Sequence, residues 1–165
     1  MKVHNHDRCS RWDSEVTTNA TFFAFLCALA SLRENDAPMT ENEVAREIVE
    51  VAFKIHSTYG PGLLESVYEA IMAHELHKRH LGVTRQQAIP LVHESIRMNV
   101  GFRADLIVAN KVVVEIKSTE SISPVHKKQL LTYLRLADKR LGLPINFNVE
   151  LIKNGISRVV NGLKE

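Results

Sequence analysis

Two apolar stretches near the middle of the chain carry charged side chains where a buried β-strand is expected. Asp105 lies between Phe102 and the apolar residues 106–108, and the segment Glu115-Ile116-Lys117 directly follows the three valines at 112–114. A charge among apolar side chains is costly unless it is paired or bound to a metal. Because residues 115 and 117 are two apart, both project from the same face of a strand. The fold must therefore supply partners for these charges, which constrains it more than any other feature of the sequence.

The turn that joins the two stretches decides whether Asp105 meets Glu115. A two-residue loop places Asp105 opposite Ile116, on the other face of the sheet from Glu115. A three-residue loop, with Asn110 or Lys111 in the left-handed backbone region, brings Asp105 directly across from Glu115, with Cβ atoms about 5 Å apart. Spacing alone leaves both registers open.

In the second register, two like charges would share one site. Such an arrangement requires a cation or a shared proton. Two carboxylates, with waters completing an octahedron, suit Mg²⁺ or Mn²⁺. In the alternative interpretation, Asp105 and Glu115 lie at strand ends in water and Lys117 neutralises one of them.

Helical patterns precede the charged strands. Thr40 and Glu43 form a capping box, T-x-x-E, which predicts a helix from there to about residue 57. The Gly-Pro-Gly corner at 60–62 ends it, and a second helix is expected over about 63–80. The expected buried residues are Val44, Ile48, Val51, Ala52 and Ile55 in the first helix and Leu64, Val67, Ile71 and Leu76 in the second.

Extended segments follow, interrupted by one helix. The expected strands are 83–93, 96–108, 112–117, 145–152 and 156–160. Pro90 predicts an edge position or a bulge in the first strand. Ser123-Pro124, with the proline near the first helical position, opens a third helix that ends near 142–144, and the pair Asn154-Gly155 predicts a hairpin turn before the last strand. The sequence therefore predicts an α/β layer architecture with the order ααβββαββ.

Length and charge set the remaining limits. The 165 residues suggest one domain, 40–165, after an N-terminal extension, 1–39, that is either helical or disordered. The net charge of +2 provides no strong overall field for nucleic acid, so binding of a polyanion has to depend on a local site. The apolar run 22–30 is about half of the ~20 residues that a membrane span needs. We expect a cytoplasmic protein with no membrane partner; the alternative is secretion, with 22–30 as the signal-peptide core.

Several segments resemble one family of enzymes. Asp105 with Glu115-Ile116-Lys117 resembles the D…(D/E)-x-K signature of the PD-(D/E)XK nuclease superfamily. The segment Gly62-Leu63-Leu64-Glu65-Ser66-Val67-Tyr68 is similar to the pattern that names the GxxExxY protein family within it. The stretches GPGLLESVYE, GFRADLIV, VEIKS, PVHKKQLLTYLRL and INFNV also resemble that family, in order, across 40–162. The resemblance implies a restriction-endonuclease-like αβββαβ core, a central mixed sheet flanked by helices, with an additional N-terminal helix.

The same resemblance implies a metal-dependent nuclease that acts on DNA, or alternatively RNA. The implied ligands of Mg²⁺, for which Mn²⁺ can substitute, are Asp105, Glu115 and the backbone carbonyl of Ile116. The implied catalytic residues are Lys117, Glu65, Gln129 and Tyr133, of which the last two match a Q-x-x-x-Y element. The expected substrate contacts are Tyr68, Arg103, His126, Lys127 and Lys128. A binding module that retains the fold without catalysis is the alternative function, and the oligomeric state is not readable.

Each of these roles has a structural alternative. Lys117 can form a simple salt bridge, and Glu65 in the first turn of a helix suits the helix dipole. A helical tyrosine such as Tyr68 is more often part of a core. The basic residues at 126–128 can form a solvated helix face.

Overall fold

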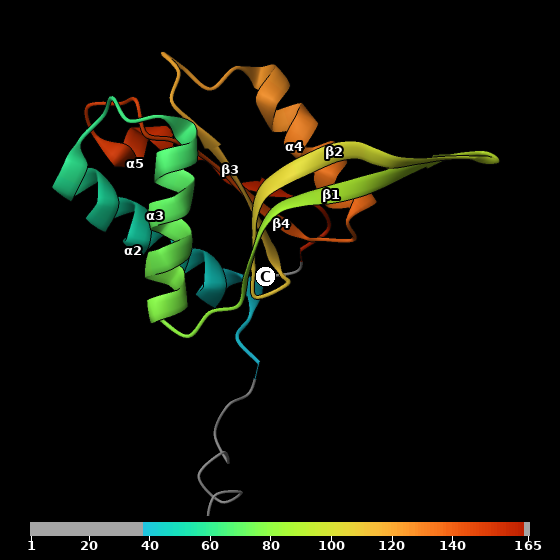
Figure 1. Cartoon of the computed structure of the whole chain (residues 1–165), viewed down its shortest axis with the longest axis horizontal. Helices are drawn as coiled ribbons and strands as arrows, with labels where there is room; N and C mark the ends of the chain where they lie inside the picture. Colours follow the sequence, from blue (N-terminus) through green and yellow to red (C-terminus); the bar gives the residue numbers. More distant parts are fainter. Residues whose placement is uncertain (1–37, 164–165) are drawn as a thin grey trace, which may run out of the picture. The chain divides into compact units, whose positions relative to one another are not determined.

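The computed structural model describes residues 38–163 and arranges them in two layers of helices around one sheet (Figure 1). The elements are α2 (Glu41–Tyr59), α3 (Glu65–Lys78), β1 (Val83–His93), β2 (Ile96–Val108), β3 (Val112–Lys117), α4 (Pro124–Leu136), β4 (Leu141–Asn146), α5 (Ile152–Gly155) and β5 (Val159–Val160). The sheet order is β1-β2-β3-β4-β5. Among the strands of residues 38–163, β3 and β4 alone pair in parallel, so the sheet is mixed, as predicted.

Two groups of buried side chains hold the layers together. One, the α2–α3 cluster, joins both long helices to residues such as Leu106 and Val114 on one face of the sheet. The other, the α4 cluster, joins α4 to residues such as Ala104 and Ile107 on the opposite face. Ala104 and Leu106 lie two residues apart in β2 yet pack in different clusters, so β2 changes face at Asp105, between them.

The helix α2 forms as its sequence predicts. The hydroxyl of Thr40 accepts a hydrogen bond from the Glu43 N–H at 3.3 Å, and the Glu43 carboxylate accepts one from the Thr40 N–H at 2.7 Å. This capping box satisfies donors that the first turn cannot pair. All five residues of the expected apolar stripe are buried.

The buried face of α3 differs from the expected one. Leu64 is 72% exposed and Val67 is 39% exposed, whereas Tyr68, Met72 and Leu76 are fully buried. The Tyr68 hydroxyl donates to the Gly60 carbonyl at 2.7 Å, so the aromatic residue fixes the corner and the helix face together. The prediction of Leu64 and Val67 as core residues is therefore wrong.

The predicted bounds of the fourth strand and third helix are also wrong. β4 begins at Leu141, four residues before the prediction, and α4 ends at Leu136. Pro144 lies inside β4, where a missing N–H normally disfavours a strand. Its carbonyl accepts from the Ser157 N–H at 3.1 Å, and its nitrogen faces the same edge of β4, where β5 has already ended. The proline therefore removes no hydrogen bond from the pairing with β3.

The Asn154-Gly155 pair does not form a hairpin turn. It ends the one-turn helix α5 instead, and Gly155 packs against the end of β4. A Cβ at Gly155 would lie 2.1 Å from the carbonyl oxygen of Asn146, so this close approach, rather than turn geometry, requires the glycine.

No helix among residues 38–163 is both long and apolar enough to cross a lipid bilayer. The apolar run 22–30 and the predictions for residues 1–37 lie outside the described residues.

Candidate metal and active site

The turn between β2 and β3 has a three-residue loop. Val108 pairs with Val112, and the Lys111 N–H donates to the Val108 carbonyl at 2.9 Å. Ala109 and Asn110 have φ values of 50° and 55°. The left-handed backbone expected at Asn110 or Lys111 thus falls on Asn110, with Ala109 as its neighbour. The register that brings the two carboxylates to one side is the one adopted.

This register places Asp105 across from Glu115, one position beyond the last ladder pair, Leu106 with Val114. There the Asp105 carboxylate replaces the partner strand as acceptor, because Oδ2 accepts from the Ile116 N–H at 2.8 Å. The N–H and C=O of one strand residue point toward the same neighbouring strand. The Ile116 carbonyl therefore faces the same gap as the two carboxylates.

Glu115 is buried and only half satisfied. It is 9% exposed, Oε1 accepts from Lys117 Nζ at 2.9 Å, and Oε2 has no hydrogen-bond partner among the described residues. Burial, reinforced by the charge of Asp105, raises the pKa of Glu115 to about 6. Burial likewise raises the pKa of Asp105. Two carboxyls whose charged forms are both disfavoured make a site that gains from a cation.

Lys117 and Glu65 complete the charged cluster. Burial alone would lower the pKa of Lys117, but its hydrogen bond to Glu115 and the surrounding carboxylates raise it. Glu65, the first residue of α3, accepts from the Ser118 N–H at 2.8 Å, which ties the helix to the end of β3. Its charge also acts on Glu115, so the structure brings Glu65, Asp105, Glu115 and Lys117 together.

Sequence reasoning missed two residues that support Asp105. The Gln86 amide nitrogen donates to Glu69 Oε2 at 2.5 Å and contacts Asp105 Oδ1 at 3.3 Å. Glu69 is 5% exposed and also accepts from Arg85 Nε at 2.8 Å. Gln86 has a φ of 49°, a strained conformation that directs its amide between the two carboxylates. An available signal was the polar run 84–87 at the start of an otherwise apolar strand.

The helix α4 contributes a hydrogen-bonded pair. The Gln129 amide donates to the Tyr133 hydroxyl at 2.6 Å, as their four-residue spacing allows. Tyr133 stacks at a tilt on Phe102, with ring centroids 4.6 Å apart. Burial and the charge of Glu115 raise the pKa of Tyr133, which places this hydroxyl beside the carboxylates.

Tyr68 is not available to a substrate. Its side chain has no exposed surface, it stacks on Phe147 at 4.2 Å, and its hydroxyl bridges Gly60 and Leu63. The prediction of Tyr68 as a substrate contact is therefore wrong. Its role is to hold the glycine corner from which Glu65 projects.

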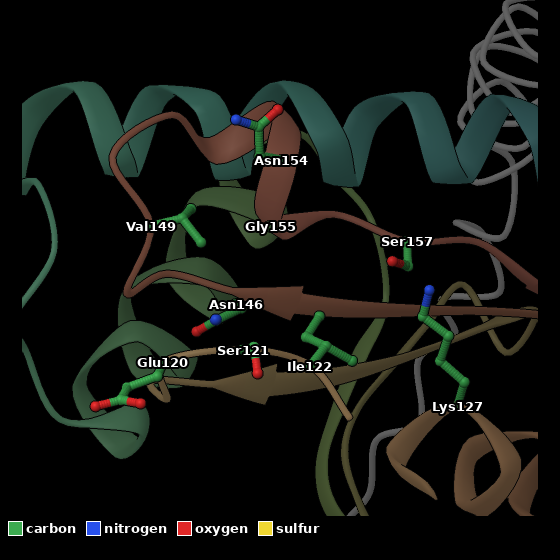
Figure 2. A pocket seen from close by; sticks show the side chains of 9 residues that line it. All are labelled: Glu120, Ser121, Ile122, Lys127, Asn146, Val149, Asn154, Gly155 and Ser157. Carbon is green, nitrogen blue, oxygen red and sulfur yellow. The ribbon is translucent and has the colours of Figure 1, made fainter. Parts of the chain in front are cut away.

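The predicted basic contacts are dispersed. Arg103 is exposed on β2, two residues from Asp105, and Lys128 is exposed on α4. His126 is partly buried, and its Nδ1 has no partner among residues 38–163. Lys127 rises from α4 toward Ser157 in a separate pocket of about 280 Å³ (Figure 2). None of the four charged site residues lines that pocket, so the structure does not bring Lys127 to them.

The donor set fits a cation that retains much of its water. The described part of the chain holds no group of three or more His, Cys, Asp or Glu residues arranged to bind a metal. Mg²⁺ is usually held by only one or two carboxylates, together with waters and substrate phosphates. Asp105, Glu115 and the Ile116 carbonyl match that requirement, and the unpartnered Glu115 oxygen offers the free acceptor.

We expect Glu115→Gln to stabilise the metal-free protein at alkaline pH. The unfolded chain loses this proton near the usual pKa of 4.5, whereas the folded chain retains it to about 6. Stability therefore falls by about 2 kcal/mol as pH rises through this window, and a glutamine escapes the loss. Urea denaturation in chelator should show the variant to be more stable at about pH 8 and equal at about pH 4.

Glu150→Gln, at an exposed position, is the matched control and should leave the free energy of unfolding unchanged at both pH values. A Glu115→Gln protein less stable than wild type at alkaline pH would show that the ion pair with Lys117 outweighs the cost of burial.

Most of this chain matches one known protein family. A family model described as the PD-(D/E)XK nuclease superfamily matches residues 42–159, which run from α2 to the first residue of β5. No curated protein and no solved structure gives a significant match.

Proposed function

Because the chain belongs to the PD-(D/E)XK nuclease superfamily, we propose that it hydrolyses phosphodiester bonds in DNA with the aid of Mg²⁺, for which Mn²⁺ can substitute. The observation that carries the proposal is the opposition of half-buried Asp105 and buried Glu115, beside the ammonium group of Lys117. Within the superfamily, Gly62, Glu65 and Tyr68 favour the GxxExxY family. Residues 40–165 would form the nuclease-like domain of a cytoplasmic protein.

Asp105, Glu115 and the Ile116 carbonyl would hold the metal. A bound divalent cation lowers the pKa of a coordinated water and stabilises negative charge on the scissile phosphate. The Ile116 N–H and the Gln86 amide fix the orientation of Asp105, and Lys117 leaves one oxygen of Glu115 free. The site is thus prepared for a cation by the chain's own contacts.

Lys117 would orient the attacking water and stabilise the charge that develops on the phosphate. Its raised pKa keeps it protonated, which suits electrostatic stabilisation rather than proton abstraction. The Gln129–Tyr133 pair, on the neighbouring helix, would position the water or a phosphate oxygen through the exposed Gln129 amide. Glu65, held by the Ser118 N–H, would add a further carboxylate that accepts hydrogen bonds from the waters around the cation.

The substrate contacts would come from Arg103, His126 and Lys128, with Lys127 binding a more distant part of the substrate from its own pocket. The alternative function is a nucleic-acid- or protein-binding module without turnover. The presence of both carboxylates and the lysine favours an enzyme, because binding alone does not require one buried and one half-buried acid whose charges repel.

The test is a cleavage assay with purified protein, on single- and double-stranded DNA and RNA of mixed sequence. We expect cleavage of DNA in Mg²⁺ or Mn²⁺ and none in chelator. Binding of nucleic acid without cleavage in either metal would support the binding module. A protein that neither binds nor cleaves any of these nucleic acids would overturn the proposal.

A further inference from the structure

The pocket that Lys127 enters, with a volume of about 280 Å³, is a second polar site beside the carboxylates (Figure 2). Three segments line it: the loop 120–122, the start of α4 with Lys127, and the chain that runs from Asn146, the last residue of β4, to Ser157. Its volume is close to the lower end of the ~300–1,000 Å³ range of small-molecule pockets. The pocket therefore has room for one small ligand.

The pocket and the candidate active site lie on the same face of the sheet. Lys117 and Asn146 are partners in the parallel β3–β4 ladder, and paired residues share a face. Gly142 shares that face with Asn146, and a Cβ there would meet Leu130 of α4 at 2.9 Å, so the face is the one that α4 covers. Neighbouring strands lie about 4.8 Å apart. The floor of the pocket thus begins about 5 Å from the backbone of Lys117.

Ser157 extends this face beyond β4. Its N–H donates to the Pro144 carbonyl at 3.1 Å, so it lies beside the outer edge of β4. Ile156 packs with the α2–α3 cluster and Val159 with the α4 cluster, so Ser157 points to the α4 side, as Val159 does. Two strand spacings separate Ser157 from β3, about 10 Å. Since a stacked nucleic-acid strand advances about 3.4 Å per nucleotide, the pocket lies within about three nucleotides of a phosphate bound at β3.

The two ends of the pocket carry opposite charges. Figure 2 shows Glu120 at one end and Lys127 at the other, with the Lys127 side chain extended toward Ser157. Within residues 38–163, neither charged group has a hydrogen-bond or ion-pair partner. A lysine ammonium binds phosphate as a point charge, and a serine hydroxyl donates to the same kind of oxygen. The end at Lys127 and Ser157 therefore suits a phosphate group.

The rest of the pocket suits a sugar and a base. Ile122 and Val149 line it between the charged ends and offer apolar contact to a ring (Figure 2). The Asn154 amide and the Glu120 carboxylate can accept hydrogen bonds from amino and hydroxyl groups. Inorganic phosphate would use one end of the pocket only, whereas a nucleotide matches both ends.

We propose that this pocket binds one nucleotide, with the phosphate at Lys127 and Ser157 and the sugar and base toward Glu120. The nucleotide is either a unit of the substrate strand or a free mononucleotide, since both present the same groups. The strand-linked form rests on the proposed nuclease function, whereas binding of a free mononucleotide does not.

The first experiment titrates the ¹⁵N-labelled full chain with the deoxynucleoside 5′-monophosphates in chelator and follows the backbone amide signals. Without metal, the carboxylates repel the ligand, so the response reports the pocket. We expect the signals of Asn146 and Ser157 to move. Lys127→Ala should weaken binding about tenfold, the loss of one charge-assisted hydrogen bond. Arg135→Ala, at an exposed position on the same helix, is the matched control and should bind as wild type.

Cleavage kinetics then distinguish the two sources of the nucleotide. If the pocket holds a unit of the substrate strand, Lys127→Ala raises KM for DNA in Mg²⁺ and leaves kcat unchanged, and mononucleotides inhibit cleavage competitively. If it holds a free mononucleotide, the same variant loses mononucleotide binding while KM and kcat keep their wild-type values. Either result, together with the amide shifts, supports the nucleotide pocket.

Three results would overturn this inference. They are unmoved Asn146 and Ser157 signals with every nucleotide, undiminished nucleotide binding by Lys127→Ala, and binding of inorganic phosphate as tight as that of the nucleotides. The proposed function fails separately. A wild-type protein that binds mononucleotides in the pocket but cleaves no nucleic acid would overturn the nuclease proposal and leave the free-mononucleotide site in place.

Discussion

Asp105→Asn should reduce the rate of metal-dependent DNA cleavage by about a thousandfold or more. A bound cation provides several kcal/mol of transition-state stabilisation, and the substitution removes one of its two carboxylate ligands. Asparagine keeps the volume and can still accept from the Ile116 N–H, so the fold should persist. The expected signature is a lower kcat together with a higher Mg²⁺ concentration for half-maximal rate.

Asp138→Asn is the matched control for this substitution. Asp138 is exposed after α4 with a φ of 50°, a conformation that asparagine tolerates well. It should leave cleavage and its metal dependence unchanged. If the Asp105 variant cleaves at the wild-type rate while remaining folded in thermal denaturation, the activity arises elsewhere, and the assigned metal ligands are wrong.

Lys117→Met should lower kcat by about a hundredfold to a thousandfold, the range found when one electrostatic donor to a transition state is removed. Methionine retains the buried stem, and the 18% exposed side chain of Lys117 leaves little room for rearrangement. Because the ammonium group repels a cation and occupies one Glu115 oxygen, the half-saturating Mg²⁺ concentration should stay equal or fall. This response differs from that of the Asp105 variant.

Lys153→Met, at an exposed position on α5, is the control and should behave as wild type. Cleavage by Lys117→Met at the wild-type rate would assign Lys117 to a purely structural ion pair with Glu115. In that case the substitution would appear only as a loss of stability above about pH 6, where Glu115 is ionised.

The sequence predicted the parts of the fold that depend on local patterns. The capping box at Thr40 and the bounds of the first three strands follow from side-chain chemistry and alternation, and the structure confirms them. The pairing of Asp105 with Glu115 was one of two registers that the sequence left open. The choice depends on whether the turn has two or three residues, and the three-residue turn needs a positive φ at Ala109, which the residue type does not predict.

The errors occur where tertiary contacts override local pattern. Leu64 belongs to a plausible apolar stripe, but the stacking of Tyr68 on Phe147 sets the orientation of α3. Pro144 can lie inside β4 because its nitrogen, which has no hydrogen to donate, faces an edge of β4 where no strand needs that donor. This depends on where β5 stops pairing with β4, which is a tertiary feature. The support of Asp105 by Gln86 depends on a positive φ in mid-strand, which no propensity predicts.

The three-residue turn also limits how a chain of this kind could lose its activity. Deleting or inserting one residue at 109–111 would carry Asp105 to the other face of the sheet, but it would also move Leu106 and Val108 out of the α2–α3 cluster. The same alternation of side chains along β2 thus determines both the packing of the hydrophobic core and the position of the acidic pair. Insertions and deletions here would be eliminated as folding defects, so a folded but inactive descendant would arise by substitution of the acids, with the turn length intact.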